Sequence, residues 1–200
     1  MNTRFLFFLY HLLLCSTAFA KEKNDVLFSI VSDGKWGYID SHGTEVIPPV
    51  FRSAGNFSEG LAPARLNGNY GYIDATGKFV IAEAYDYANP FSNGLALVYK
   101  NGKPFFIDHK GKKAFDWPSA PPTCFKYHCA IVKADNDKQG LIDTKGRLIL
   151  DVGYYCYDSF RNGVLTVNKA REAPLYNKSD YGLVDSNGHF LVPTGRYREM

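Results

Sequence analysis

The stretch KWGYIDSHG at residues 35–43 recurs with small changes as NYGYIDATG at residues 69–77. Both copies place a glycine between two aromatic residues, followed by an aliphatic residue, an aspartate and, three residues later, a second glycine. Three weaker copies follow, with the pattern aspartates of all five at Asp40, Asp74, Asp108, Asp143 and Asp185. The steps between these aspartates are 34, 34, 35 and 42 residues. A period of roughly 20 to 50 residues is typical of a repeat architecture.

Residues that turn the chain bound each copy. Asp33-Gly34 and Asn67-Gly68 precede the first two copies, and such dipeptides tolerate the positive φ angles of tight hairpin turns. The Asp-x-x-Gly motif that ends each copy suits a type I turn followed by a left-handed glycine. The runs between these turns have the length of strands. We therefore predict an all-β fold in which each repeat of about 34 residues is a three-stranded antiparallel meander.

A lone meander cannot bury its apolar face, so the five repeats are expected to stack on one another. We favour an open β-solenoid or spiral array. A closed ring resembling a five-bladed β-propeller is the alternative, although propeller blades usually have four strands.

Residues 1–20 have the composition of a secretory signal peptide. Arg4 precedes an apolar run of about ten residues, and Ala18-Phe19-Ala20 is a small-x-small cleavage site. The run is too short for a membrane-spanning helix, which needs about twenty residues. We therefore predict a protein exported to the periplasm or secreted, with residues 21–200 forming a single repeat domain. A lipoprotein anchored through Cys15 is the alternative.

The chain beyond residue 20 is nearly neutral. It carries 22 lysines and arginines against 20 aspartates and glutamates, because Arg4 is the only charged residue before Lys21. A nucleic-acid-binding domain normally has a clustered basic face, so this balance argues against nucleic acid as a partner. No stretch after residue 20 is long and apolar enough to predict an integral membrane span.

The repeated segments resemble the WG-repeat family, a β-rich bacterial repeat. The resemblance rests on residues 36–40 and 70–74, the Asp-Gly and Asn-Gly turns before them, the later turn glycine and Val46-Ile47-Pro48, and it extends over residues 26 to about 193. It implies an all-β repeat domain that mediates interactions, without a catalytic residue. The third copy departs from the pattern, because Phe105 replaces the central glycine and puts its close backbone contact in question.

We interpret the five aspartates as turn residues, because an aspartate beside a glycine commonly accepts hydrogen bonds from nearby backbone N–H groups. Calcium binding and acid–base chemistry are the alternatives. Residues 135–140 resemble the start of a calcium loop, but Gly146 stands where an EF-hand requires its bidentate glutamate. We predict no metal and no cofactor.

Two cysteines flank a chain reversal in the third copy. Residues 57–60 (FSEG) and 91–94 (FSNG) end in a glycine, whereas residues 125–128 (FKYH) do not. Cys124 and Cys129 lie on either side of FKYH, where a tight turn brings two residues to the Cα separation of about 5.5–6 Å that a disulfide prefers. We predict a Cys124–Cys129 bond that stabilises the reversal in place of glycine. Cys156 is then unpaired, either buried or bonded to another chain.

A metal site is the alternative use of these residues. Cys124, His128 and Cys129 are chemically suitable for copper or zinc, but no further cluster in the sequence completes the tetrahedral set of structural zinc.

Three places in the chain are candidates for binding. Trp36 and Tyr70 occupy the same position in successive copies, and we expect them to pack between repeats, with stacking on sugar rings as the alternative. Trp117 lies in a proline-rich loop. The last period is lengthened by residues 169–178, and insertions in repeat proteins often lie on the binding face. The candidate residues of this insertion are Arg171, Tyr176 and Lys178.

No catalytic signature is found: the chain has no Gly-x-Ser-x-Gly elbow, no His-Glu-x-x-His and no phosphate-binding glycine loop. We therefore predict a non-catalytic, extracytoplasmic binding or scaffold module with a protein or peptide partner in the cell envelope. A lectin-like module that binds carbohydrate or peptidoglycan is the second candidate.

Overall fold

The computed structural model describes residues 26–116, 122, 125–133, 138–169 and 181–197. Every regular element in these residues is a β-strand, and every strand pair is antiparallel. The predicted all-β fold is therefore confirmed.

The strands form four sheets, and neighbouring strands in each are hydrogen-bonded. The first sheet contains β1 (Phe28–Ser32), β2 (Lys35–Ile39) and β3 (Glu45–Phe51). The second contains β4 (Ser53–Ala54), β5 (Ala62–Arg65), β6 (Tyr70–Ile73) and β7 (Phe79–Tyr85). The third, from its far edge, contains β11 (Lys113–Asp116), β10 (Lys103–Ile107), β9 (Ala96–Lys100) and β8 (Tyr87–Ala88). The fourth contains β12 (Cys129–Lys133), β13 (Gln139–Asp143), β14 (Leu148–Arg161), β15 (Val164–Asn168), β16 (Tyr181–Asp185) and β17 (Phe190–Tyr197).

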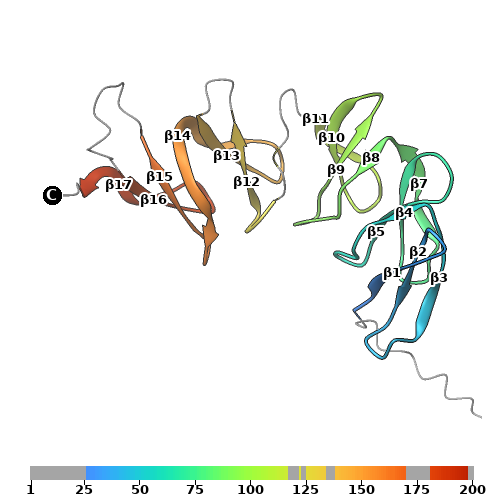
Figure 1. Cartoon of the computed structure of the whole chain (residues 1–200). Coiled ribbons are helices and arrows are strands. Elements are labelled where there is room, and N and C mark those ends of the chain that lie inside the picture. Colours follow the sequence, from blue (N-terminus) through green and yellow to red (C-terminus); the bar gives the residue numbers. More distant parts are fainter. Residues whose placement is uncertain (1–25, 117–121, 123–124, 134–137, 170–180, 198–200) are drawn as a thin grey trace, which may run out of the picture.

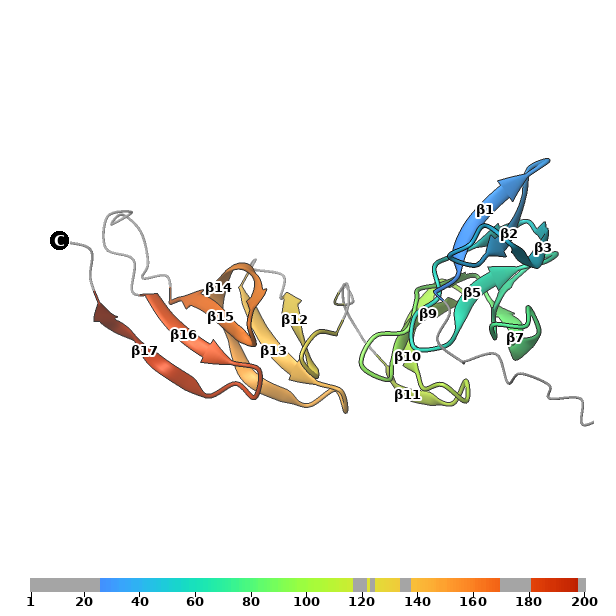
Figure 2. The ribbon, with the colours of Figure 1, turned by 90° about the horizontal axis from the view of Figure 1, so that it is seen from below.

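The sheets follow one another in an open, bent row. In Figures 1 and 2, β1–β3 and β16–β17 lie at opposite ends of this row, with the remaining strands between them in chain order. The described strands close into neither a barrel nor a ring.

A fourth strand in the second and third sheets is a feature that the expected three-stranded meander lacks. After β3 the chain does not leave the structure but pairs with the next copy: Arg52 N donates to Arg65 O (2.8 Å) and Gly55 N to Pro63 O (2.8 Å). The short strand β4 lies between these bonds, and β8 repeats the arrangement beside β9. In the fourth sheet the two parts are one continuous strand, β14, which pairs first with β13 and then with β15.

The central glycine of each copy lies where the third strand bulges. Tyr70 pairs with Tyr85 and Tyr72 with Ile81, so two residues of β6 span four residues of β7. A Cβ atom on Gly71 would lie 2.5 Å from the Ile81 carbonyl oxygen, too close for any side chain. Glycine is required here because the bulge brings the third strand against the backbone of the central strand.

The third copy, which has Phe105 instead of glycine, lacks this bulge. Phe105 pairs with Asp116 and Phe106 with Phe115, one residue to one. The close backbone contact that the sequence put in question is therefore not made in this copy.

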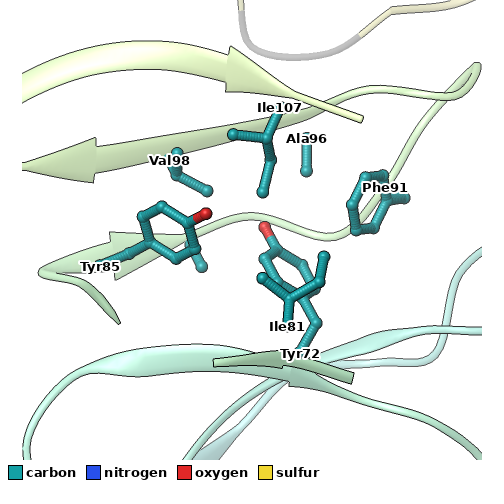
Figure 3. Packing of buried hydrophobic residues seen from close by; sticks show 8 residues of the cluster. Tyr72, Ile81, Tyr85, Phe91, Ala96, Val98 and Ile107 are labelled. Carbon is teal, nitrogen blue, oxygen red and sulfur yellow. The ribbon is translucent and has the colours of Figure 1, made fainter. Parts of the chain in front are cut away.

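The hydrophobic core consists of four clusters, each between two consecutive copies. The earlier copy contributes the residue after the central glycine together with residues of its third strand, and the later copy contributes two alternate residues of its first strand and the residue before its aspartate. In Figure 3, Tyr72, Ile81 and Tyr85 meet Ala96, Val98 and Ile107 in this way. The other clusters bring together Tyr38 and Ile47 with Ala62, Ala64 and Ile73; Phe106 with Ala130, Val132 and Ile142; and Leu141 and Leu150 with Leu165, Val167 and Val184.

A column of tight turns joins the copies at a second place. Ser58 Oγ donates to the carbonyl oxygen of Phe91 (2.6 Å), and Ser92 Oγ donates in the same way to that of Phe125. Each serine therefore bonds the phenylalanine that opens the next turn. Two more bonds join these turns: Gly94 N to Glu59 Oε2 (3.0 Å) and His128 N to Asn93 Oδ1 (3.2 Å).

The turn without glycine keeps the geometry of the others. His128 has φ +65°, in the left-handed region occupied by Gly60 and Gly94 in the equivalent turns, and Lys126 bridges Cys129 as Ser92 bridges Leu95. A histidine in this conformation carries a steric penalty that glycine does not.

The bulge makes a mutational prediction. Gly71→Ala should lower the free energy of unfolding by about 1–3 kcal/mol, because the new methyl group must displace backbone of β7. Gly68→Ala is the matched control, since a Cβ atom there meets nothing within 4 Å and the backbone φ is not left-handed. Urea unfolding of both variants measures the difference. Equal stability of the two variants would contradict the role given to the bulge.

The left-handed histidine makes another. His128→Gly should raise the free energy of unfolding by about 0.5–1 kcal/mol, the left-handed penalty less the added entropy of an unfolded glycine. Gly94→Ala, at the equivalent position with open space around it, should change stability in the opposite direction. Thermal unfolding of the two variants is the measurement, and a loss of stability in His128→Gly would contradict the steric reason.

Candidate binding surface

A row of aromatic side chains with one arginine crosses from the second sheet to the third. The ring centroids of Tyr70 and Tyr87 are 6.0 Å apart and those of Tyr87 and Tyr99 are 6.1 Å apart, both in edge-to-face geometry. The guanidinium carbon of Arg65 lies over the Tyr70 ring, 5.1 Å from its centroid. We call these four residues the tyrosine row.

The sheets hold each member of the tyrosine row in place. Tyr87 and Tyr99 are direct partners across the β8–β9 pair. Tyr70 begins β6, and its hydroxyl donates to Ser53 Oγ at 3.0 Å. Arg65 ends β5, and its Nε atom is shielded from solvent with no hydrogen-bond partner among the described residues. The cation–π contact with Tyr70 is therefore the interaction that orients the guanidinium group.

The tyrosine row offers a rigid surface with both apolar and polar groups. Tyr87 is 50% exposed, whereas Tyr70 and Tyr99 are half-buried and support it from both sides. Tyrosine and arginine dominate the binding energy of many protein interfaces, because they provide a large contact area with few rotatable bonds and retain a polar end. This arrangement can hold an extended or flat partner by stacking and hydrogen bonding.

The sequence identified only part of this surface. It singled out Tyr70, but missed Arg65, Tyr87 and Tyr99. The period contains the signal that was overlooked: Arg65 and Tyr99 are 34 residues apart and occupy the same position in successive copies. An alignment of the copies that considered all exposed positions would have placed these residues in one column.

Trp36, the other aromatic residue singled out, lies at the N-terminal end of the row of sheets. It is half-buried and packs against the cluster of Tyr38, Ile47 and Phe51. Packing between copies, the interpretation that the sequence favoured, agrees with this position. Neither Trp36 nor Tyr70 is fully buried, so exposure does not remove the sugar-stacking alternative.

The remaining candidates fall outside the described residues: Trp117, Arg171, Tyr176, Lys178 and Cys124. The predicted Cys124–Cys129 bond and the alternative site at Cys124, His128 and Cys129 therefore stay predictions. Cys129 itself is a buried free thiol whose Sγ atom lies 3.3 Å from the Lys126 carbonyl oxygen, and Cys156 is a free, half-buried thiol. Burial raises the pKa of each thiol to about 11, with the charge of Asp185 adding to the effect at Cys129. Both thiols are consequently protonated near neutral pH and react slowly.

The five aspartates are turn residues, as predicted. In each copy one carboxylate oxygen, Oδ1, accepts hydrogen bonds from the backbone N–H groups two and four residues later, at 2.8 to 3.2 Å. The N–H of the turn glycine donates to the aspartate carbonyl oxygen in all five copies. The aspartates do not converge on a common site. Among the described residues, no three His, Cys, Asp or Glu side chains are grouped as metal ligands would be.

These hydrogen bonds lower the pKa of three of the turn carboxyls. Partial burial acts to raise the pKa of Asp143, but the bonds from the Lys145 and Arg147 amides, the Arg147 side chain and its charge outweigh it. The pKa values of Asp74 and Asp185 are lowered by the same balance, against the same opposing effect of burial.

Comparison with known proteins identifies the repeat and the fold. A family model described as the WG containing repeat matches residues 36–70 and 70–103. No curated protein sequence matches the chain. A solved structure described as a crystal structure of the eukaryotic initiation factor is similar in fold, with a TM-score of 0.56 at 13% sequence identity. The similarity covers 86% of this chain but only 52% of that one, so this chain spans about half of the other's length. No helix among the described residues has the length and apolar character needed to cross a membrane.

The turn aspartates make stability depend on acid pH. A carboxyl whose pKa is lowered by folding stabilises the protein fully above its unfolded pKa of about 3.9, and this contribution is lost as the pH falls through the folded value. Asp143→Asn should therefore lower the thermal midpoint at pH 7 and reduce its further decrease between about pH 5 and pH 3. Glu45→Gln, an exposed change outside the turns, is the control. An unchanged acid profile in Asp143→Asn would contradict the assignment.

Proposed function

Residues 36–103 consist of two WG repeats, and from this premise we propose that the protein is a non-catalytic binding module that holds a protein or peptide partner on the surface of stacked β-sheets. The observation that carries the proposal is the tyrosine row, an exposed aromatic surface that spans two sheets and contains an arginine.

The whole chain is proposed to be a solenoid of five repeats. The same Asp-x-x-Gly hydrogen bonds occur at five places, and four clusters of equivalent composition lie between the copies. An open row leaves one side of every sheet edge accessible along its length, and elongated repeat arrays use such surfaces for binding. WG repeats in general suggest a protein-interaction module.

A protein or peptide partner fits the tyrosine row better than a small molecule. The row is a surface feature with side chains from β5, β6, β8 and β9, not an enclosed cavity, and its extent suits a contact distributed over several residues of a partner. The near-neutral charge of the chain favours a contact based on stacking and hydrogen bonds over one based on electrostatic steering.

A carbohydrate ligand, peptidoglycan included, is the second candidate. Tyr87 presents half of its surface to solvent, and Trp36 is not fully enclosed, so aromatic faces remain accessible to sugar rings. The signal-peptide-like residues 1–20 support a location outside the cytoplasm, in the periplasm or beyond the cell, for either ligand class.

The proposal predicts the effect of removing the exposed tyrosine. Tyr87→Ala should weaken binding at least tenfold, the loss of about 1.4 kcal/mol or more that is typical when an interface aromatic is truncated. Leu148→Ala is the matched control, because Leu148 is also 50% exposed but lies on β14, away from the tyrosine row. Partners captured from cell-envelope extract by the unchanged protein, then titrated individually, provide the measurement.

Three outcomes separate the candidates. A protein or peptide that loses affinity for Tyr87→Ala and keeps it for Leu148→Ala supports the proposal. Soluble peptidoglycan fragments or glycans that behave in this way support the carbohydrate candidate. Partners that bind both variants equally well would remove the tyrosine row from the site.

A further inference from the structure

The four clusters between copies follow one rule of size. The residue after the central glycine of the earlier copy faces a residue on the first strand of the later copy. An aromatic residue at the former position is matched by alanine at the latter, and leucine is matched by leucine. The pairs in chain order are Tyr38 with Ala62, Tyr72 with Ala96, Phe106 with Ala130, and Leu141 with Leu165. All eight side chains are at most 2% exposed.

The N-terminal end of the row of sheets has one such face without a neighbour. Phe28 on β1 occupies the position of Ala62, Ala96 and Ala130, and it is 51% exposed. Ile39 precedes Asp40 as the fully buried Ile73 precedes Asp74, but it is only half-buried. We call Phe28, Ile30 and Ile39 the N-terminal face.

The C-terminal end has the opposite face without a neighbour. Leu183 follows Gly182 as Tyr72 follows Gly71, yet it is 36% exposed whereas Tyr72 is fully buried. Val192, its partner on β17, is half-buried, whereas the equivalent Ile47 is buried. We call Leu183 and Val192 the C-terminal face.

Two further features of the first sheet lack the neighbour that later copies have. Among the described strands, β1 has no outer partner, whereas β4, β8 and the end of β14 pair with β5, β9 and β15. A Cβ atom on Gly43 would meet nothing within 4 Å, whereas one on the equivalent Gly77 would lie 2.9 Å from Ile47 of the preceding copy. The first sheet is thus built to receive a preceding copy on its N-terminal face.

We propose that the protein associates head to tail, with the C-terminal face of one molecule packed on the N-terminal face of a second copy as consecutive copies pack inside the chain. The two faces fit each other in size: Leu183 is smaller than the tyrosines of the inner clusters, and Phe28 is larger than the alanines that face them. The pair continues the series in which a smaller side chain on one face is offset by a larger one on the other.

The geometry of this contact determines the kind of assembly. Two different faces meet, so the contact is heterologous, and each new molecule leaves one face of each kind free. An open row of sheets extended in this way forms chains of molecules, not a closed dimer. The inference is independent of the tyrosine row, which lies on β5, β6, β8 and β9, away from both faces.

Charged substitutions on the two faces test the proposal by complementation. Phe28→Glu removes the N-terminal face and Leu183→Glu removes the C-terminal face, and both side chains are exposed enough to accept a charge without unfolding. Val80→Glu is the matched control, because Val80 is 50% exposed and lies on β7, in an inner copy. Analytical ultracentrifugation over a range of protein concentrations measures the mass, and circular dichroism verifies the fold of each variant.

The unchanged protein and Val80→Glu are expected to grow in mean mass with concentration, while Phe28→Glu and Leu183→Glu stay monomeric. An equimolar mixture of these two variants retains one intact face of each kind, so it should form a dimer that contains one molecule of each and grows no further. Mixing restores a complex only if both variants are folded, so unfolding cannot imitate this result.

Other results would overturn the proposal. A monomeric unchanged protein at every concentration means that another segment of the chain, or a different partner, covers the faces. Association that survives either single variant means that the contact lies elsewhere. Failure of the two folded variants to combine excludes the head-to-tail arrangement. As a second test, Phe28→Ala with Leu183→Tyr in one chain reproduces the inner pairing and should associate, whereas each change alone should weaken association.

Discussion

Burial of each copy's apolar face by the next copy is the interaction on which the structure depends. A three-stranded meander has too little interior to enclose a side chain as large as tyrosine, yet Tyr38 and Tyr72 are completely buried, because the first strand of the following copy covers them. A fully buried large aliphatic side chain contributes about 1.5–3 kcal/mol, and nearly all such side chains in the described residues lie in clusters shared by two copies. The stability of any one copy therefore depends on its neighbours, as expected for a quasi-one-dimensional protein.

Glycine makes this close stacking possible in two different ways. Gly71 allows the third strand to bulge against the central strand, which leads the chain out of one sheet and into the next as β8. Gly77 lies against Ile47 of the preceding copy, so it limits how closely two sheets approach. The third copy shows what happens without the first of these glycines: Phe105 and Phe106 pair regularly with the third strand, and the copy is still stacked because Phe106 contacts the next cluster.

Binding and assembly use different parts of the same repeated unit. The tyrosine row is formed where the outer strand of one copy lies beside the first strand of the next, so it exists only in the stacked array. The end faces are the same apolar surfaces that hold the array together, left without a neighbour. A repeat protein thus exposes at its ends the contact that it satisfies inside, and terminal copies with polar outer faces are the usual means of preventing further growth.

The sequence alone determined the all-β class, the period, the turn role of the five aspartates and the special position of Phe105. These properties depend on hydrogen bonds within five residues and on the φ angles that glycine and asparagine accept, and both can be deduced from local residue types. Only the tertiary structure decided that a fourth strand passes from one copy to the next, that Tyr87 and Tyr99 join Tyr70 in one surface, and that Leu183 is exposed whereas its equivalents are buried. The physical reason is that these features depend on which residues meet across sheets, over separations of 12 to 34 residues, and a repeated pattern specifies each copy without stating what covers it.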